Sequence, residues 1–363
     1  MRRIAIEKLK SGMVIARTIY DANARVLLQA GIIIEDVYIK RLNELGIRSI
    51  YVKDPILFDI DIPEAISETT RLKTIKEIKT NFVNIENNLK LNIRSVKSLV
   101  DNILDELLAS HDTLIHLTDL RTYDDYTFGH SVNVAILSNM TGISLGYHDF
   151  KLKELGLGAI LHDIGKTKID KYILNKPDDL TSEEYEEIKN HPAYGFAILR
   201  NYDDMPLLSA HIAYQHHERW DGQGYPRNLE GEEIHEYARI VAVADVYDAL
   251  IADRPYRPAY TVNQALTVLK RMSNTYLDQE MVNALISNIA VYPIGSIVEL
   301  NTGDIAIVVD VNRNAPTRPV LNVIYHKTTQ KLCSPHEIDL SKLTTIIIKK
   351  SLTPEDLDLI IKN

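Results

Sequence analysis

The sequence predicts a mainly α-helical protein with a small α+β domain at its N-terminus, a long connecting helix and a small β-rich segment at its C-terminus. Three observations support this fold class. Apolar residues between 111 and 290 recur at the three- and four-residue steps of amphipathic helices. A similar pattern without proline runs from residue 72 to 107. Residues 1–53 and 291–363 instead carry short apolar runs between turn residues, which is typical of short strands.

The composition is that of a globular protein with full hydrophobic cores, since 45% of its 363 residues are apolar. A net charge of -9 argues against a nucleic-acid polymer as partner, because affinity for a duplex comes largely from neutralised phosphates. The net charge does not argue against a local basic pocket. Cys333 is the only cysteine, and no apolar stretch is long enough to cross a bilayer. We therefore expect a cytoplasmic protein without a membrane span.

Residues 1–53 form the predicted N-terminal domain. Apolar runs at residues 4–6 and 50–52 indicate strands, and residues 36–45 have helical spacing before Gly46. No cluster of ligand-type residues occurs in this part of the sequence. The sequence alone therefore favours a docking or folding module, and a sensory or regulatory input is the alternative.

Residues 54–110 are predicted to be a linker followed by one long amphipathic helix. Pro55 and Pro63 lie among acidic residues and mark the linker. The apolar seam of residues 72–107 is that of a coiled coil or of a helix packed on a neighbour. We expect this helix to pair with a second copy in a homodimer. Packing against the helical domain of the same chain is the alternative.

Turn and capping signals set the limits of the helices between residues 111 and 290. Thr181 and Glu184 have the spacing of a capping box, and Gly146 and Gly165 stop the helices that precede them. A glycine-rich loop is expected at residues 221–226. The expected helices cover residues 126–144, 152–161, 206–218 and 237–252, with further helices opening near 181 and 261.

Histidines and aspartates lie inside or at the ends of these helices. Imidazole nitrogens and carboxylate oxygens are ligands that divalent transition metals accept. Five imidazoles and two carboxylates exceed one tetrahedral site but suit two metals that share a carboxylate, an arrangement that hydrolyses phosphate esters. Spacing alone supports a metal site of unspecified use. The set is His130, His162, Asp163, His191, His216, His217 and Asp245.

The sequence after Pro293 changes to strand-like runs at residues 297–300, 305–311, 320–325 and 345–348. These runs predict a small antiparallel β-structure without assigned chemistry. Four histidines outside the set above receive no chemical role. We interpret His326 and His336 as isolated surface residues, and His211 and His235 as hydrogen-bonded core residues.

Two stretches closely resemble the motifs of the HD-GYP family: HDIGK at residues 162–166 and HHERWDGQGYP at residues 216–226. This family is the branch of HD-domain metal phosphohydrolases known as cyclic di-GMP phosphodiesterases. The resemblance covers about residues 111–290, half of the chain. It implies an all-helical HD-type catalytic domain there and hydrolysis of cyclic di-GMP to pGpG, with GMP left open as a further product.

The resemblance also implies a role for each ligand-type residue. The family's metal ligands fall on all seven residues of the set, and Asp163 would bridge two metals, iron or manganese in preference. A water held between the metals would attack phosphorus, and Lys166 would stabilise the charge that develops on the phosphate. Members with a third metal use a glutamate where this chain has Tyr126. We therefore expect two metals, unless Asp124 or Asp125 supplies the missing carboxylate.

Further positions resemble the family's substrate contacts. Arg254 and Arg257 match basic residues that contact ligand phosphate, for which the guanidinium fork is suited. Tyr225 is expected to line the guanine pocket. Asp248, one helical turn beyond Asp245, is a candidate for substrate contact or for support of a ligand histidine.

Two other functions compete with this interpretation. A non-hydrolysing cyclic di-GMP receptor or interaction module would share the fold, and a hydrolase could act on a different cyclic dinucleotide. Degenerate relatives are expected to lose ligands or the lysine, whereas this chain keeps all of them. The sequence therefore favours an enzyme without fixing its dinucleotide.

Overall fold

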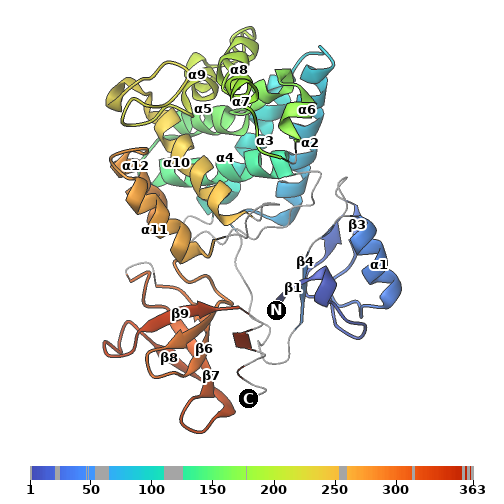
Figure 1. Cartoon of the computed structure of the whole chain (residues 1–363), viewed down its shortest axis with the longest axis vertical. Helices are drawn as coiled ribbons and strands as arrows, with labels where there is room; N and C mark the ends of the chain where they lie inside the picture. The colour runs from blue at the N-terminus through green and yellow to red at the C-terminus, as the bar shows by residue number, and fades with distance from the viewer. Residues whose placement is uncertain are drawn as a thin grey trace.

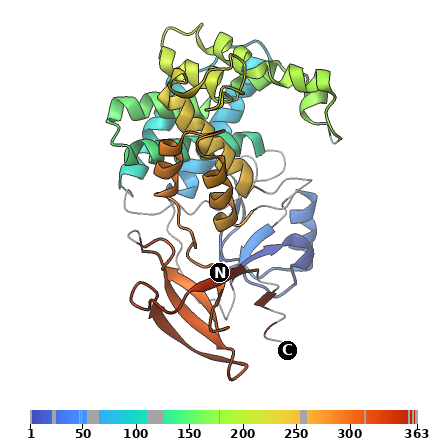
Figure 2. The same cartoon turned by 60° about the vertical axis from the view of Figure 1, so that its left-hand side comes forward.

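The computed structural model places a helical domain above two smaller parts, an N-terminal α+β part and a C-terminal sheet, which lie on different sides below it (Figures 1 and 2). This arrangement confirms the predicted fold class in outline. The residues that the structure describes are 2–20, 25–45, 47, 49–53, 65–109, 126–176, 178–252, 260–312, 315–353, 356–357 and 360.

The N-terminal part consists of two small antiparallel strand pairs and one helix. Strand β1 (Arg2–Ala5) pairs with β4 (Ser49–Val52), and β2 (Ile19–Tyr20) pairs with β3 (Val26–Leu28). A 3-10 turn, η1 (Ile6–Lys8), follows β1, and helix α1 (Asp36–Glu44) precedes β4. The apolar runs predicted as strands supply its core. The buried core residues are Ile4, Ile6, Leu9, Ile15, Ile34, Leu42, Ile47, Ile50 and Val52.

The stretch predicted as one long helix is two helices, α2 (Glu68–Glu86) and α3 (Ile93–Ala109). Three asparagines end the first helix and start the second. Asn87 is the C-cap of α2, and Asn88 adopts a left-handed backbone with φ 57°. The Asn92 side chain accepts the Ser95 backbone N–H at 3.1 Å, as an N-cap does. The prediction of a continuous helix from 72 to 107 is therefore wrong.

The apolar seam of α2 and α3 packs inside the same chain. Ile78, Val96 and Ile103 are fully buried, and Phe82 meets Phe128 of α4 edge to face at 5.6 Å between ring centroids. Helix α2 contacts α4, and α3 contacts α5. The seam proposed for a homodimer is thus already covered, which corrects that expectation in favour of packing against the chain's own helical domain.

Helix α4 (Tyr126–Ser144) forms the centre of the helical domain. Every residue from 129 to 142 is buried, as expected for a helix that is covered on all sides. Helices α2, α5, α10 and α12 contact it. The remaining elements are α5 (Asp149–Ile160), η3 (Ile164–Lys168), α6 (Lys171–Leu174), α7 (Ser182–Ile188), α8 (His191–Leu199), α9 (Leu207–Gln215), η4 (Gly231–Glu233), α10 (Glu236–Ile251), α11 (Val262–Met272) and α12 (Gln279–Ile286).

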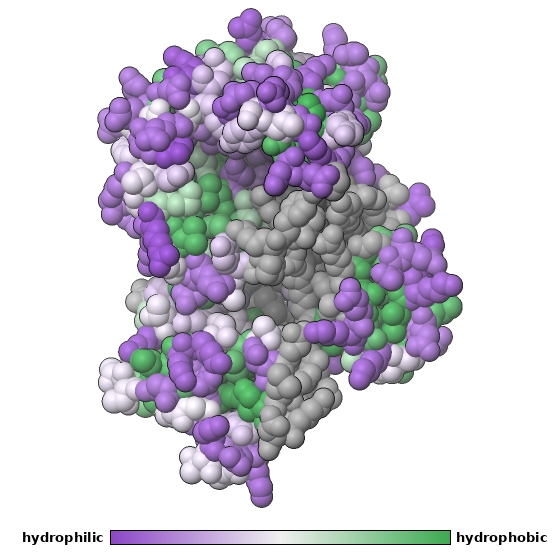
Figure 3. Space-filling model, viewed as in Figure 1, coloured by the Kyte–Doolittle hydropathy of each residue, from purple (hydrophilic) through white to green (hydrophobic). Residues whose placement is uncertain are grey.

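The predicted helix limits agree with these elements within a few residues. The capping box at Thr181 and Glu184 is present, and a second box joins Thr261 to Gln264. Among the described helices, none combines the length and the apolar character needed to cross a membrane. Hydrophilic residues cover most of the upper part of the helical domain on the face shown in Figure 3.

The C-terminal part is a five-stranded antiparallel sheet with strand order β8-β7-β6-β5-β9. Its strands are β5 (Ile297–Leu300), β6 (Ile305–Asp310), β7 (Val320–His326), β8 (Lys331–Asp339) and β9 (Ile348–Leu352). Apolar side chains cover both faces, with Ile297 on one side and Val298 on the other. Strand β8 was not predicted, because it lies at the sheet edge and is mostly exposed, so it lacks apolar alternation.

Candidate metal centre

The structure brings all seven predicted ligand residues together in the helical domain. They come from α4, the turn between α5 and η3, the start of α8, the end of α9, and α10. They form two groups, and the ligand atoms within each group lie within 4.8 Å of one another. The first group is Asp163, His191, His216 and His217, and the second is His130, His162 and Asp245.

Gly165 allows the two chain segments of the first group to touch. A Cβ atom at this position would lie 1.9 Å from the His191 carbonyl oxygen and 2.5 Å from the Gly195 nitrogen. No side chain fits there, so only glycine lets η3 pack against the first turn of α8. This contact sets Asp163 beside His191.

Backbone carbonyls fix the tautomers of three histidines. The Nδ1 atoms of His162 and His191 each lie 2.7 Å from a carbonyl oxygen, those of Ala159 and Ile188 respectively. His216 Nδ1 lies 3.0 Å from the Ala213 oxygen. A carbonyl oxygen only accepts, so each Nδ1 carries the proton and each Nε2 presents a lone pair to the site.

These lone pairs meet inside the cluster without donors to satisfy them. His191 Nε2 and His216 Nε2 are 3.3 Å apart. His162 Nε2 and Asp163 Oδ1 are buried and have no hydrogen-bond partner in the described structure. Unpaired buried acceptors are costly, and a cation is the ligand that relieves several of them at once. The residues present therefore fit divalent metal ions.

Asp163 lies between the two groups. Its Oδ1 atom is 3.4 Å from His191 Nε2 and 3.7 Å from His216 Nε2. Its Oδ2 atom is 3.4 Å from His162 Nε2 and 2.6 Å from Lys166 Nζ. One carboxylate oxygen thus faces each group, which is the orientation that a bridging ligand requires.

The electrostatics keep most of these groups in the form that binds metal. Burial would raise the pKa of Asp163, but Lys166 and His162 outweigh it and hold that pKa well below its usual range. Burial lowers the pKa of His191 to about 3 and that of His217 well below its usual value. At neutral pH Asp163 is therefore ionised and both imidazoles are neutral, which are the ligating forms.

His130 is the exception, because it lies between two carboxylates. Its Nε2 atom is 3.0 Å from Asp245 Oδ1, and its Nδ1 atom is 2.7 Å from Asp248 Oδ2. Burial would lower the pKa of His130, but the hydrogen bonds to both aspartates raise it to about 9. A proton thus occupies the gap between His130 and Asp245 that a cation would take.

Asp248 is a buried hydrogen-bond partner of His130. It is fully buried, and its other oxygen, Oδ1, accepts from the Asn133 side chain at 2.8 Å. The side-chain oxygen of Asn133, Oδ1, in turn accepts from the guanidinium group of Arg71 of α2. These contacts favour support of His130 over contact with substrate, the two roles expected for Asp248. Asn133 was missed, although it lies one helical turn after His130.

The glycine-rich loop folds back over the first group. Tyr225 stacks on His217 with ring centroids 4.8 Å apart and an angle of 26° between the planes. Glu218, only 3% exposed, accepts the backbone N–H groups of Arg227 at 2.7 Å and Leu229 at 3.1 Å. Glu218 was not predicted, although the sequence shows an acidic residue directly after the histidine pair.

Several other predicted residues are not part of this cluster or cannot be described. His235 accepts the Tyr237 backbone N–H at 3.2 Å, which confirms a hydrogen-bonded residue. His211 packs on Phe196, and its buried Nδ1 has no hydrogen-bond partner among the described residues, so that expectation is wrong. The residues that lie outside the described ranges are Arg254, Arg257, Asp124 and Asp125, together with the side chain of Tyr126.

Comparison with known families agrees with this helical metal-ligand cluster. A model of the HD domain matches residues 102–281, and a model of the KOW domain associated with the HD domain matches residues 297–359. The chain belongs to the HD-domain family, in its HD-GYP branch.

Three relatives illustrate the match. The chain is 34% identical over 246 residues to a cyclic di-GMP phosphodiesterase of Pseudomonas aeruginosa, covering 67% of this chain and 59% of that protein. It is 34% identical over 227 residues to a cyclic di-GMP phosphodiesterase of Thermotoga maritima, covering 60% and 62%. It is 39% identical over 160 residues to the 3′3′-cGAMP-specific phosphodiesterase 3 of Vibrio cholerae, covering 44% and 35%. The chain thus spans less than two thirds of the length of each.

Proposed function

We propose that this protein is a metal-dependent phosphodiesterase that hydrolyses cyclic di-GMP to pGpG. The observation that carries the proposal is a buried carboxylate, Asp163, whose two oxygens face two separate groups of ligand atoms. The names of the Pseudomonas and Thermotoga relatives support the choice of substrate. Further cleavage to GMP is compatible with the same chemistry.

The proposed ligands are the seven residues of the two groups, and they would hold two divalent ions. Imidazole-rich sites with a shared carboxylate accept iron and manganese, which are the metals we propose. When bound, these ions would polarise the phosphoryl oxygens and lower the pKa of a water molecule to near neutrality.

The chain's own residues would prepare this chemistry. The carbonyl oxygens of Ala159 and Ile188 orient two imidazoles, and Asp248 orients His130. Lys166 pairs with Asp163, and its side chain is 32% exposed. This partial exposure supports a role in which its ammonium group stabilises negative charge that develops on the substrate phosphate.

The proposed substrate contacts are Tyr225 for a guanine base and Arg254 and Arg257 for phosphate. Tyr225 is supported by its place over the ligand His217, which keeps an aromatic ring next to the reacting centre. The two arginines rest on motif resemblance alone. Hydrolysis of 3′3′-cGAMP is a second candidate function, favoured by the 39% identity to the Vibrio relative.

The test is anaerobic purification of the full chain, measurement of its metal content, and chromatography of the products formed from cyclic di-GMP, 3′3′-cGAMP and cyclic di-AMP. Wild type is compared with Asp163→Ala and with the control Asp170→Ala, an exposed N-cap residue on the same segment. We expect two metals per chain and pGpG from wild type and control, and neither from Asp163→Ala. Tight dinucleotide binding without product by metal-loaded wild type would refute the enzyme and favour a receptor.

A further inference from the structure

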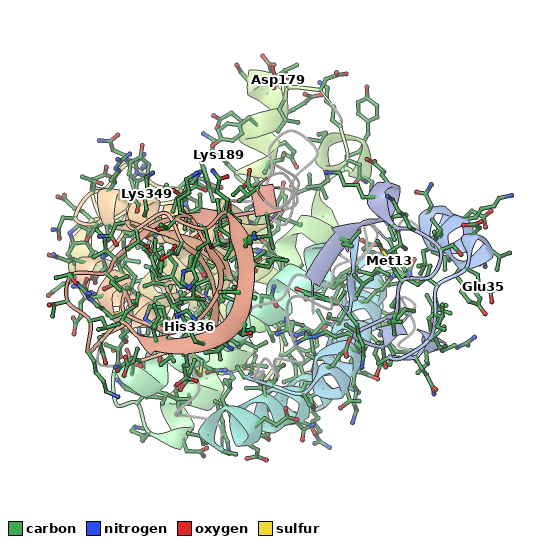
Figure 4. The ribbon with its side chains drawn as sticks, turned by 90° about the horizontal axis from the view of Figure 1, so that it is seen from below. Met13, Glu35, Asp179, Lys189, His336 and Lys349 are labelled. Atoms are coloured by element: carbon green, nitrogen blue, oxygen red, sulfur yellow. The ribbon has the colours of Figure 1, made fainter. Side chains whose placement is uncertain are left out.

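We propose a second metal site in the C-terminal sheet, formed by His326, Cys333 and His336 and suited to a soft or borderline cation such as Zn²⁺. His326 ends β7, and the other two residues belong to β8. The site lies in the part that matches the KOW domain and shares no residue with the HD-domain cluster. Figure 4 labels His336 on this sheet, seen from below.

A shift in strand pairing brings the three side chains together. Tyr325 pairs with Leu332, but Val323 pairs with His336, so β8 contains two more residues here than a regular ladder would. In a regular ladder His336 would lie five pairs from His326, about 17 Å along the strand, and the bulge reduces this to three pairs, about 10 Å. The two imidazole centroids are then 5.3 Å apart. The interpretation of both histidines as isolated residues is therefore wrong, although His336 is exposed as expected.

The candidate ligand atoms lie close enough together to bind one metal ion. The nearest nitrogen of each imidazole and the Cys333 sulfur all lie within 4.8 Å of one another, the same limit that encloses both groups of the HD-domain cluster. Tetrahedral zinc separates sulfur and imidazole ligands by about 3.4–3.6 Å, as follows from its bond lengths. Cys333 and His326 are half-buried and His336 is exposed. Small rotations of these side chains would therefore bring the ligand atoms to the separation that zinc requires.

A neighbouring carboxylate favours the ligating tautomer of His326. Asp304 Oδ1 lies 3.4 Å from His326 Nδ1, which places the Nδ1 proton toward Asp304 and leaves Nε2 as the ligating atom. Asp304 is itself held in place. Its Oδ1 accepts the Lys327 backbone N–H at 2.9 Å, and its Oδ2 accepts from the Thr302 hydroxyl at 2.9 Å.

The ligand chemistry distinguishes this site from the HD-domain cluster. A thiolate with two imidazoles selects zinc and other soft or borderline ions, whereas the HD-domain ligands contain no sulfur. With three protein ligands, one coordination position is left for water or another ligand. A bound ion would join β7 to the edge strand β8 at the bulge, where the backbone ladder is interrupted.

The experiment uses Co²⁺ as a spectroscopic substitute for Zn²⁺ in the full chain. Cys333 is the only cysteine, so a thiolate-to-cobalt charge-transfer band reports this site alone, whatever the HD domain holds. In protein whose HD-domain cluster has first been filled with metal, we expect the band to saturate at one further Co²⁺ per chain and to vanish in Cys333→Ser. His326→Gln and His336→Gln should weaken the affinity at least tenfold, and Asp304→Asn about tenfold, as loss of a partner of a ligand histidine does.

The matched control is His148→Gln, which removes an exposed histidine of the helical domain and should leave the band unchanged. Protection of Cys333 from iodoacetamide by Zn²⁺ gives a second measurement on folded wild type, and His336→Gln should abolish that protection. The proposal is overturned if wild type shows neither a charge-transfer band nor protection. The proposal is equally overturned if the charge-transfer band and the protection persist at wild-type affinity in His326→Gln and His336→Gln. The thiol would then bind metal without help from the histidines.

Discussion

Replacement of Asp248 by asparagine tests whether this buried carboxylate sets the metal affinity of His130. In the wild-type structure both carboxylate oxygens accept, one from His130 Nδ1 at 2.7 Å and one from Asn133 Nδ2 at 2.8 Å. The change to asparagine replaces one of the two acceptors with an NH₂ group and hardly alters the volume. His130 then satisfies that NH₂ group best when its Nδ1 accepts and its Nε2 carries the proton.

The expected loss of metal affinity in Asp248→Asn follows from the tautomer of His130 that a metal requires. A metal on Nε2 forces the proton back to Nδ1, where it would face the new NH₂ group and lose its hydrogen bond. A buried donor without a partner costs about 1–3 kcal/mol. Because about 1.4 kcal/mol is tenfold in an equilibrium constant, Asp248→Asn should weaken metal binding at this group by roughly 5- to 150-fold.

The assay is metal titration in competition with a chelator, run beside thermal unfolding of the metal-free protein. Asp278→Asn is the matched control, because Asp278 is 6% exposed and pairs with Arg239 at 2.6 Å elsewhere in the same domain. It should lower the thermal stability without changing metal affinity. Folded Asp248→Asn with an affinity within twofold of wild type, or an equal loss in the control, would refute the reasoning.

Three further predictions follow from the same cluster. Lys166→Ala should lower turnover at least a hundredfold, as loss of a group that stabilises transition-state charge does, and should leave the metal content unchanged. Equal losses of turnover and of metal content would show that Lys166 has a structural role. Glu218→Ala removes two charge-assisted hydrogen bonds worth about 1.5–3 kcal/mol each, so hydrogen exchange at Arg227 and Leu229 should accelerate, and unchanged protection would contradict this. Since the pKa of His130 is raised to about 9 in the metal-free site, metal uptake at pH 7 should release a proton and the affinity should rise with pH up to that value. Calorimetry in buffers of different ionisation enthalpy measures this release, and its absence would contradict the assignment.

Much of the helical domain was predictable because its signals are local. Glycine stops and capping boxes fix helix ends wherever they occur, and the box at Thr181 and Glu184 needed no tertiary information. The seven ligand-type residues were found from two motifs and from their positions inside or at the ends of predicted helices. The structure adds what the motifs do not contain, namely that the oxygens of Asp163 face different groups.

The incorrect predictions concern features that depend on tertiary contacts. The seam of residues 72–107 keeps its period across a turn because α2 and α3 both bury their apolar faces in one core, so periodicity alone could not reveal the break. The approach of His326 to His336 depends on a shift in strand pairing, which no local pattern records. The role of Asp248 depends on the side chain that α4 presents to it.

The hydrogen bonds from Arg71 to Asn133 and from Asn133 to Asp248 extend the proposed metal centre to residues outside the motif-defined domain. Arg71 donates to the Asn133 oxygen, which turns the amide nitrogen toward Asp248 and leaves Asp248 accepting from both sides. The orientation of His130, a proposed metal ligand, is thus set partly from the first turn of α2, some 40 residues before the start of the motif-defined domain at residue 111. A fragment cut at that boundary keeps every proposed ligand but loses the residue that orients Asn133.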